Sequence, residues 1–133
     1  MATEILVNDG GAPARILPFT AGSAITGGRF LTMGTDGEVD HAGADAHNTI
    51  GVALVDASSG SVCSVVTGKG VICNVWLSGT VDEGLLVDIA ADGVAHSGGT
   101  DTAIAASGTA VGITLTGAAF GSTITLGKCL LRN

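Results

Sequence analysis

The chain contains two copies of one pattern of short apolar segments and glycine turns. The stretch NTIGVALVDASSGSVC aligns with TAVGITLTGAAFGSTI later in the chain, so that Gly51 matches Gly112. Upstream of each copy, FLTMGTDGEVDHAG resembles LLVDIAADGVAHSGG, and both contain an Asp-Gly pair followed by a histidine. Such a repeat is typical of similar structural units that bury their apolar faces together. We therefore expect repeat one at about residues 23–77 and repeat two at about residues 78–133.

Each unit is expected to consist of β-strands. The apolar segments are short and bounded by glycine, and no long stretch shows the 3.6-residue period of an amphipathic helix. Asp36-Gly37 and Asp92-Gly93 each separate two apolar segments, which favours hairpins with type I′ turns. Only a turn of helix is expected, near residues 100–106. The fold class is therefore predicted to be all-β, a compact barrel-like or sandwich domain. The predicted strands are residues 30–33, 39–41, 49–55, 62–67 and 71–77 in repeat one, and 85–89, 94–96, 110–116, 122–126 and 129–132 in repeat two.

The first 22 residues differ from the rest of the chain. They combine an Asn-Asp-Gly-Gly run with Pro13 and Pro18, and their apolar pieces are short. Proline lacks a backbone N–H and is therefore confined to the edges of a sheet. We interpret residues 1–22 as an extended N-terminal arm with at most one edge strand, followed by a single β domain over residues 23–133.

The core is expected to be aliphatic. Hydrophobic residues make up 46% of the 133 residues, but aromatic residues only 3%. Cys63, Cys73 and Cys129 form no C-x-x-C pair. A structural zinc site needs four closely spaced ligands, so the cysteines are interpreted as small buried or half-buried hydrophobic residues in a reducing compartment.

The charge of the chain argues against two classes of partner. The net charge is −7, and no Lys or Arg occurs between Lys69 and Lys128. Nucleic acids and anionic membrane surfaces both require clustered cations, so we expect neither as a partner. The uncharged run over residues 102–127 is long enough to span a membrane, but its many Gly, Ser and Thr residues predict strands and turns. The N-terminus also lacks the cationic start and apolar run of a secretory signal.

No recognisable catalytic or metal-binding motif is present. The sequence lacks a nucleophile elbow, a phosphate-binding loop, an H-E-x-x-H pair and an EF-hand loop. His41 and His96 occupy matching repeat positions, which favours a structural place at a strand end over a unique catalytic one. A small hydrolase or metalloenzyme would require His41 or His47 near a carboxylate. We therefore predict a protein that is not an enzyme, with no catalytic, metal-binding or cofactor-binding residues and no cofactor.

Trp76 is the single tryptophan and lies among Val and Leu residues. Such a residue is usually a core or subunit-contact residue. Trp76, Val75 and Leu77 are therefore candidate contacts between subunits. The alternative is a sugar-binding platform, with polar loops near His41 and His96. That alternative makes the protein a carbohydrate-binding or adhesion module displayed on a surface.

The stretches NTIGVALVDASSGSVCSVVTGKGVI and FLTMGTDGEVDHAG resemble segments of small phage capsid proteins. Over about residues 22–80, and more weakly up to Leu131, the chain is similar to the head-decoration or cement proteins of tailed phages, of the lambda-like type or their wider relatives. The resemblance implies a structural virion protein, made in the host cytoplasm, that binds the major capsid protein on the outer capsid surface and stabilises the capsid. It also implies a homotrimer and an N-terminal arm that reaches the shell. The arm residues implied as capsid contacts are Thr3, Ile5, Leu6, Val7, Arg15 and Ile16.

Overall fold

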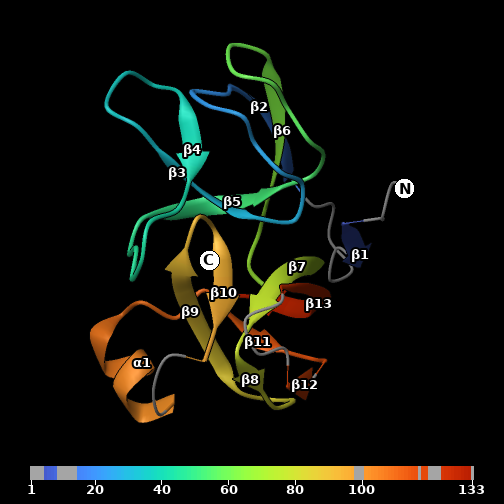
Figure 1. Ribbon diagram of the computed structural model, residues 1–133, viewed down its shortest axis with the longest axis vertical. Helices are drawn as coiled ribbons and strands as arrows, with labels where there is room; N and C mark the ends of the chain where they lie inside the picture. Colours follow the sequence, from blue (N-terminus) through green and yellow to red (C-terminus); the bar gives the residue numbers. More distant parts are fainter. Residues whose placement is uncertain (1–4, 9–14, 98–100, 117, 120–123, 133) are drawn as a thin grey trace.

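Two five-stranded barrels follow each other along the chain and fill the upper and lower halves of Figure 1. The computed structural model describes residues 5–8, 15–97, 101–116, 118–119 and 124–132. The all-β fold class expected from the sequence is confirmed. In this part of the chain, one short helix, α1 (Asp101–Ser107), forms where a helical turn is predicted.

The first barrel is built from the N-terminal half of the chain. Its strand order is β2-β6-β5-β3-β4, and all neighbours are antiparallel. A parallel bridge joins Ala21, just after β2, to Val39 in β4, and the Gly22 N–H donates to the Val39 carbonyl at 2.9 Å. This contact connects the two outer strands and closes the sheet. Its strands are β2 (Arg15–Thr20), β3 (Phe30–Met33), β4 (Val39–His41), β5 (Thr49–Ala53) and β6 (Val62–Thr67).

The second barrel closes because its last strand pairs back with its first. The order is β7-β10-β9-β11-β13, and β13 runs antiparallel to β7 from Thr125 opposite Leu77 to Leu130 opposite Ile72. Two short strands, β8 (Thr80–Val81) and β12 (Ala118–Ala119), form a separate ribbon. The barrel strands are β7 (Ile72–Ser78), β9 (Leu86–Ala91), β10 (Val94–His96), β11 (Gly112–Thr114) and β13 (Thr125–Leu131).

The two barrels share one topology, as the sequence repeat predicts. In each barrel, the first strand in the chain pairs antiparallel with the fifth strand. The first strand also meets the third strand in parallel. The second strand lies between the third and fourth strands of the sheet. The repeating units in the structure run from β2 to β6 and from β7 to β13. They therefore begin one strand earlier than the sequence suggests, because β7 is hydrogen-bonded to β13 and β10 and not to the strands of the first barrel.

The N-terminal residues contribute strands to both sheets. β1 (Leu6–Asn8) pairs antiparallel with β7, and β2 pairs with β6 over six residues, from Arg15 opposite Thr67 to Thr20 opposite Val62. The expectation of an extended backbone holds for these residues. However, β2 is a paired strand of the first barrel and not a free arm. Pro18 lies at an outer strand, where its missing N–H is tolerated.

The two Asp-Gly pairs form two different turns. Asp92 and Gly93 both have positive φ, 49° and 71°, so this hairpin has the predicted type I′ turn. In the other hairpin only Gly37 has positive φ, and its N–H donates to the Gly34 carbonyl at 3.2 Å. This geometry is a type I turn followed by a bulge, because the longer loop leaves room for one more residue before β4.

The aligned glycines, Gly51 and Gly112, are required by close approach of neighbouring strands. A Cβ at Gly51 would collide with the Val66 carbonyl oxygen on β6. A Cβ at Gly112 would collide with Sγ of Cys129 on β13. The second copy therefore keeps the glycine for the same reason as the first, since in each barrel a Cβ on the fourth strand would collide with an atom of the fifth strand.

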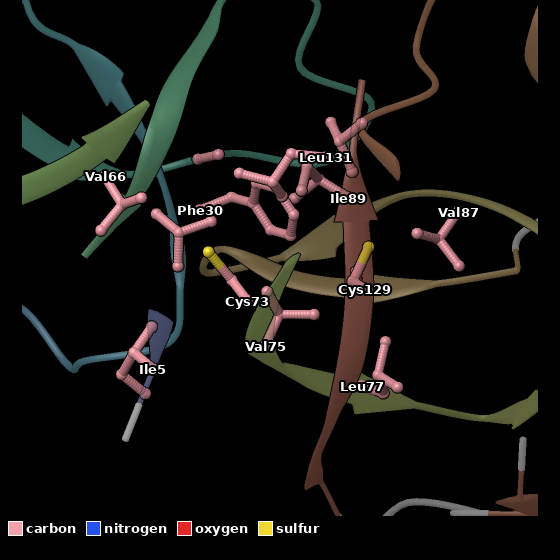
Figure 2. Close-up of a cluster of buried hydrophobic side chains, with 14 of the residues drawn as sticks. Ile5, Phe30, Val66, Cys73, Val75, Leu77, Val87, Ile89, Cys129 and Leu131 are labelled. Atoms are coloured by element: carbon pink, nitrogen blue, oxygen red, sulfur yellow. The ribbon is translucent and has the colours of Figure 1, made fainter. Parts of the chain in front are cut away.

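One buried core lies inside the second barrel and extends to the outer side of the first barrel. Figure 2 shows Phe30 and Val66 of the first barrel beside Cys73, Ile89 and Leu131 of the second. A separate cluster fills the interior of the first barrel. Since the larger cluster contains side chains from both barrels, each barrel buries part of its apolar surface against the other.

The last strand corrects the sequence analysis. Residues 122–126 and 129–132 are predicted as two strands, but β13 runs without interruption from Thr125 to Leu131. Gly127 lies within this strand. The position requires glycine because a Cβ there would come within 2.7 Å of Cδ1 of Leu77. This glycine therefore serves packing and not a turn.

The three cysteines are buried and free, as predicted. Burial raises the pKa of Cys73 and of Cys129 to about 12, and it also raises the pKa of Cys63. These thiols therefore stay protonated at neutral pH and behave as small apolar side chains.

Candidate interaction surface

The outer face of β2 and β6 carries apolar side chains that no other described element covers. Ile16 is 47% exposed, and Val62 at the far end of β6 is 69% exposed. Residues directly opposite each other on antiparallel strands share a face, so Ile16 lies with Val66, Pro18 with Ser64 and Thr20 with Val62. We call the exposed set Ile16, Pro18, Thr20 and Val62 the outer face.

The outer face continues the buried core out to the surface. Val66 lies on the same face as Ile16 and is fully buried under the second barrel together with Val52. Farther from the second barrel, the apolar face is open to solvent. Apolar residues exposed at the margin of a core make this face a candidate docking site.

The edge of β2 is protected against pairing with another strand. The Ala21 N–H donates to the Ser61 carbonyl at 2.9 Å, on the side of β6. Because these backbone groups alternate along a strand, the N–H positions of Ile16, Pro18 and Thr20 point to the opposite edge, where Gly22, just after the strand, bonds to Val39 of β4. Pro18 lacks a hydrogen-bond donor there, which interrupts the row of donors. The outer face is therefore suited to side-chain packing and not to addition of a strand.

The residues implied as capsid contacts lie in different environments. Arg15 and Ile16 are exposed on β2. Ile5 is only 5% exposed and belongs to the shared core, so it is not available as a surface contact. Leu6 and Val7 form part of β1, and Thr3 lies outside the described residues.

The residues expected at a subunit contact are mostly internal. Val75 and Leu77 are fully buried because alternate residues of β7 point into the barrel. Trp76 points to the other side and is half-buried, and its indole Nε1–H donates to the Gly27 carbonyl at 2.9 Å. Val75 and Leu77 therefore cannot contact another subunit, and Trp76 joins the two barrels of its own chain.

His41 and His96 occupy equivalent strand ends but have different partners. Nε2 of His41 accepts a hydrogen bond from the Thr26 N–H at 3.0 Å. Nε2 of His96 lies 3.2 Å from Oδ1 of the buried Asp88, without the geometry of a hydrogen bond. Burial, reinforced by the nearby Arg29, lowers the pKa of His41 below its ordinary value of 6.5.

The acidic side chains near the first Asp-Gly pair serve local structure. Oδ1 of Asp36 accepts the Glu38 N–H at 3.1 Å, and Oδ1 of Asp40 accepts the Ser23 hydroxyl at 2.7 Å. Among the described residues, no group of three or more His, Cys, Asp or Glu side chains could hold a metal ion. Over the same part of the chain, no helix is long and apolar enough to cross a membrane.

Two features of the surface could not be predicted from the sequence. Val62 belongs to a predicted strand, but nothing in its sequence separates an exposed Val from a buried one. Asp88 is buried and lies beside His96, although acidic residues are usually exposed. Only Pro18 carried a usable signal, because proline in a strand indicates an outer position.

The fold resembles that of a known phage protein. The solved structure of the head fiber gp8.5 N base of bacteriophage phi29 matches with a TM-score of 0.67 and 19% sequence identity, over 90% of this chain and 95% of that one. No family model and no curated protein sequence matches the chain. At this identity the comparison demonstrates a common fold, and the two-barrel architecture is therefore shared by both proteins.

Proposed function

We propose that this protein is a structural component of a bacteriophage virion. The observation that carries the proposal is the likeness of nearly the whole chain to the base of a phage head fiber. A structural role needs a rigid fold and an adhesive surface. The shared core of the two barrels provides the first, and the outer face of β2 and β6 provides the second.

The more specific proposal is a decoration or cement protein on the outer surface of the capsid. In this proposal the outer face packs against the major capsid protein, with Ile16 and Val62 as apolar anchors and Arg15 at the rim. Full burial of an aliphatic side chain contributes about 1.5–3 kcal/mol. Two anchors alone give weak binding, so the proposal includes a homotrimer, in which three surfaces bind together with higher avidity.

The likeness to a head fiber base supports a second candidate function. Here the chain anchors a fiber to the head and contributes nothing to the strength of the shell. The two candidates differ in a measurable way. A cement protein raises the temperature at which filled heads release their DNA, whereas an anchor leaves that temperature unchanged.

The test is cosedimentation of the purified protein with heads assembled without it. The double variant Ile16→Ser with Val62→Ser removes both anchors and should weaken binding by about 2 kcal/mol, roughly thirtyfold in Kd. Leu115→Ser is the matched control, because Leu115 is 43% exposed but lies in the second barrel. Circular dichroism checks that each variant is folded.

Equal binding of the double variant and the wild type would remove the outer face from the proposal. Failure of the wild type to bind any head would remove the virion role itself. Light scattering after size exclusion should give three times the mass of one chain, and a monomer at micromolar concentration would contradict a preformed trimer.

A further inference from the structure

A three-residue strap connects the two barrels. This strap, residues 26–28, lies between β2 and β3, and its three backbone N–H groups all donate to the first barrel. In chain order they donate to Nε2 of His41 at 3.0 Å, to Oδ1 of Asp56 at 2.7 Å and to the Ala53 carbonyl at 2.8 Å. The strap is therefore held to the first barrel by one bond per residue, and one of the three acceptors is a titratable ring nitrogen.

The carbonyl groups of the strap bind the second barrel. The Gly27 carbonyl accepts the indole Nε1–H of Trp76 at 2.9 Å, and the Gly28 carbonyl accepts the backbone N–H of the same residue at 3.0 Å. Trp76 belongs to β7, the first strand of the second barrel. The strap therefore lies between His41 and the single tryptophan of the chain, with hydrogen bonds to both.

The hydrogen bond to His41 fixes its protonation state. Nε2 can accept the Thr26 N–H only when it carries no proton, so the ring is neutral and its proton is on Nδ1. A second proton would place an N–H on Nε2, directly opposite the Thr26 N–H. Two donors then face each other, the hydrogen bond is lost and the strap is repelled from the first barrel.

Charged groups around His41 have opposing effects on the pKa of its ring. Arg29, which follows the strap, disfavours the protonated ring, whereas Asp92 in the β9–β10 turn and Asp40 in β4 favour it. Arg29 also donates from Nη1 to the Asp92 carbonyl at 3.1 Å, so these groups belong to the same junction. Burial disfavours the charged ring most strongly, and its net effect with these charges is a lowered pKa.

We propose that His41 is a pH-sensitive latch, and that its protonation releases the strap from the first barrel and loosens the junction between the two barrels. His96, at the equivalent position of the second barrel, has a different partner, because its Nε2 faces the Asp88 carboxylate. The latch thus belongs to one repeat only. It responds to acidification below neutral pH and leaves the interior of each barrel unchanged.

Fluorescence of Trp76 between pH 7.5 and pH 5 tests the latch. The chain has one tryptophan and three histidines, so the variants can be matched closely. The wild type and the double variant His47→Gln with His96→Gln should both show a red shift of the emission with a single-proton transition, because the indole loses its Gly27 acceptor and becomes hydrated. His41→Gln should show no transition, since a glutamine amide oxygen accepts the Thr26 N–H but does not titrate in this range.

Amide exchange in the wild type gives a second readout that needs no variant. As the pH falls toward the pKa of His41, the protection factor of the Thr26 amide should fall by up to about tenfold for each pH unit, because the ratio of neutral to protonated ring falls tenfold, and it should level off below the pKa. Protection of the Val65 amide, within β6, should stay constant. A flat Trp76 emission in the wild type, an equal transition in a folded His41→Gln variant, or parallel loss of protection at Thr26 and Val65 would each overturn the proposal.

Discussion

Replacement of Gly51 by alanine is the sharpest test of the barrel geometry. The added methyl group would collide with the Val66 carbonyl oxygen and lie 3.0 Å from Cγ1 of Val65. Both atoms belong to β6, and the carbonyl belongs to its backbone, which cannot rotate away. Relief therefore requires β5 to move away from β6, where only Val52 opposite Val66 and Ala53 opposite Val65 pair the two strands.

The magnitude follows from these contacts. Overpacking in a well-packed interior costs about 1–3 kcal/mol. Displacement of β5 also weakens about two backbone hydrogen bonds, which contribute about 1 kcal/mol each. The sum is about 3–5 kcal/mol, a large part of the 5–15 kcal/mol stability that is typical of a domain. At about 4 °C for each kcal/mol, Tm should fall by about 12 °C or more.

Thermal and urea unfolding, followed by circular dichroism, measure this effect. Gly112→Ala should destabilise by a similar amount, because a Cβ there would collide with Sγ of Cys129 and would lie 2.8 Å from the Leu130 carbonyl oxygen, which also belongs to the backbone of the neighbouring strand. Gly43→Ala is the control, since nothing lies within 4 Å of a Cβ at that position. Its effect should stay within about 0.5 kcal/mol. If Gly51→Ala melts within about 2 °C of Gly43→Ala, close approach of β5 and β6 does not limit the fold, and the reasoning fails.

Two further predictions concern titratable groups. Because the pKa of folded His41 is lowered, the unfolded chain binds more protons below pH 6.5. The free energy of unfolding should therefore be constant above this pH and decrease as the pH falls below it, and urea titrations at several pH values should show less decrease in His41→Gln. Cys73 and Cys129 should resist alkylation in the native protein at pH 8 and react fully in urea, since burial raises the pKa of each to about 12. Rapid modification of either thiol in the folded state would contradict this.

The sequence predicts the strands well where local chemistry determines them. The Asp92-Gly93 turn forms as expected, because Asp and Gly both tolerate positive φ. Pro18 correctly indicates an outer strand. The match of Gly51 with Gly112 also identifies the repeat, since both positions exclude a Cβ for the same steric reason.

Long-range packing determines what the sequence could not predict. Gly127 is interpreted as a turn residue in the sequence, but it lies within β13. Glycine is needed there because Leu77 fills the space that a side chain would occupy. The apolar strand β7 was expected to carry subunit contacts, yet alternation directs Val75 and Leu77 into the barrel. Val62 resembles its buried neighbours in every local property. The second barrel covers Val66 but does not reach Val62, and this depends on how the two barrels pack together.

The pairing of the first strand with the last in each barrel has a consequence for biosynthesis. β2 can close the first barrel only after β6 has left the ribosome, and β7 must wait for β13 at the end of the chain. Until then the nascent first barrel exposes Phe30, Val52 and Val66, which the second barrel later covers. Such delayed burial of sequence-distant contacts slows folding and favours association of incomplete chains. Ribosome stalling after β6 should therefore yield a product that requires chaperones, whereas a product that extends past β13 should fold without them.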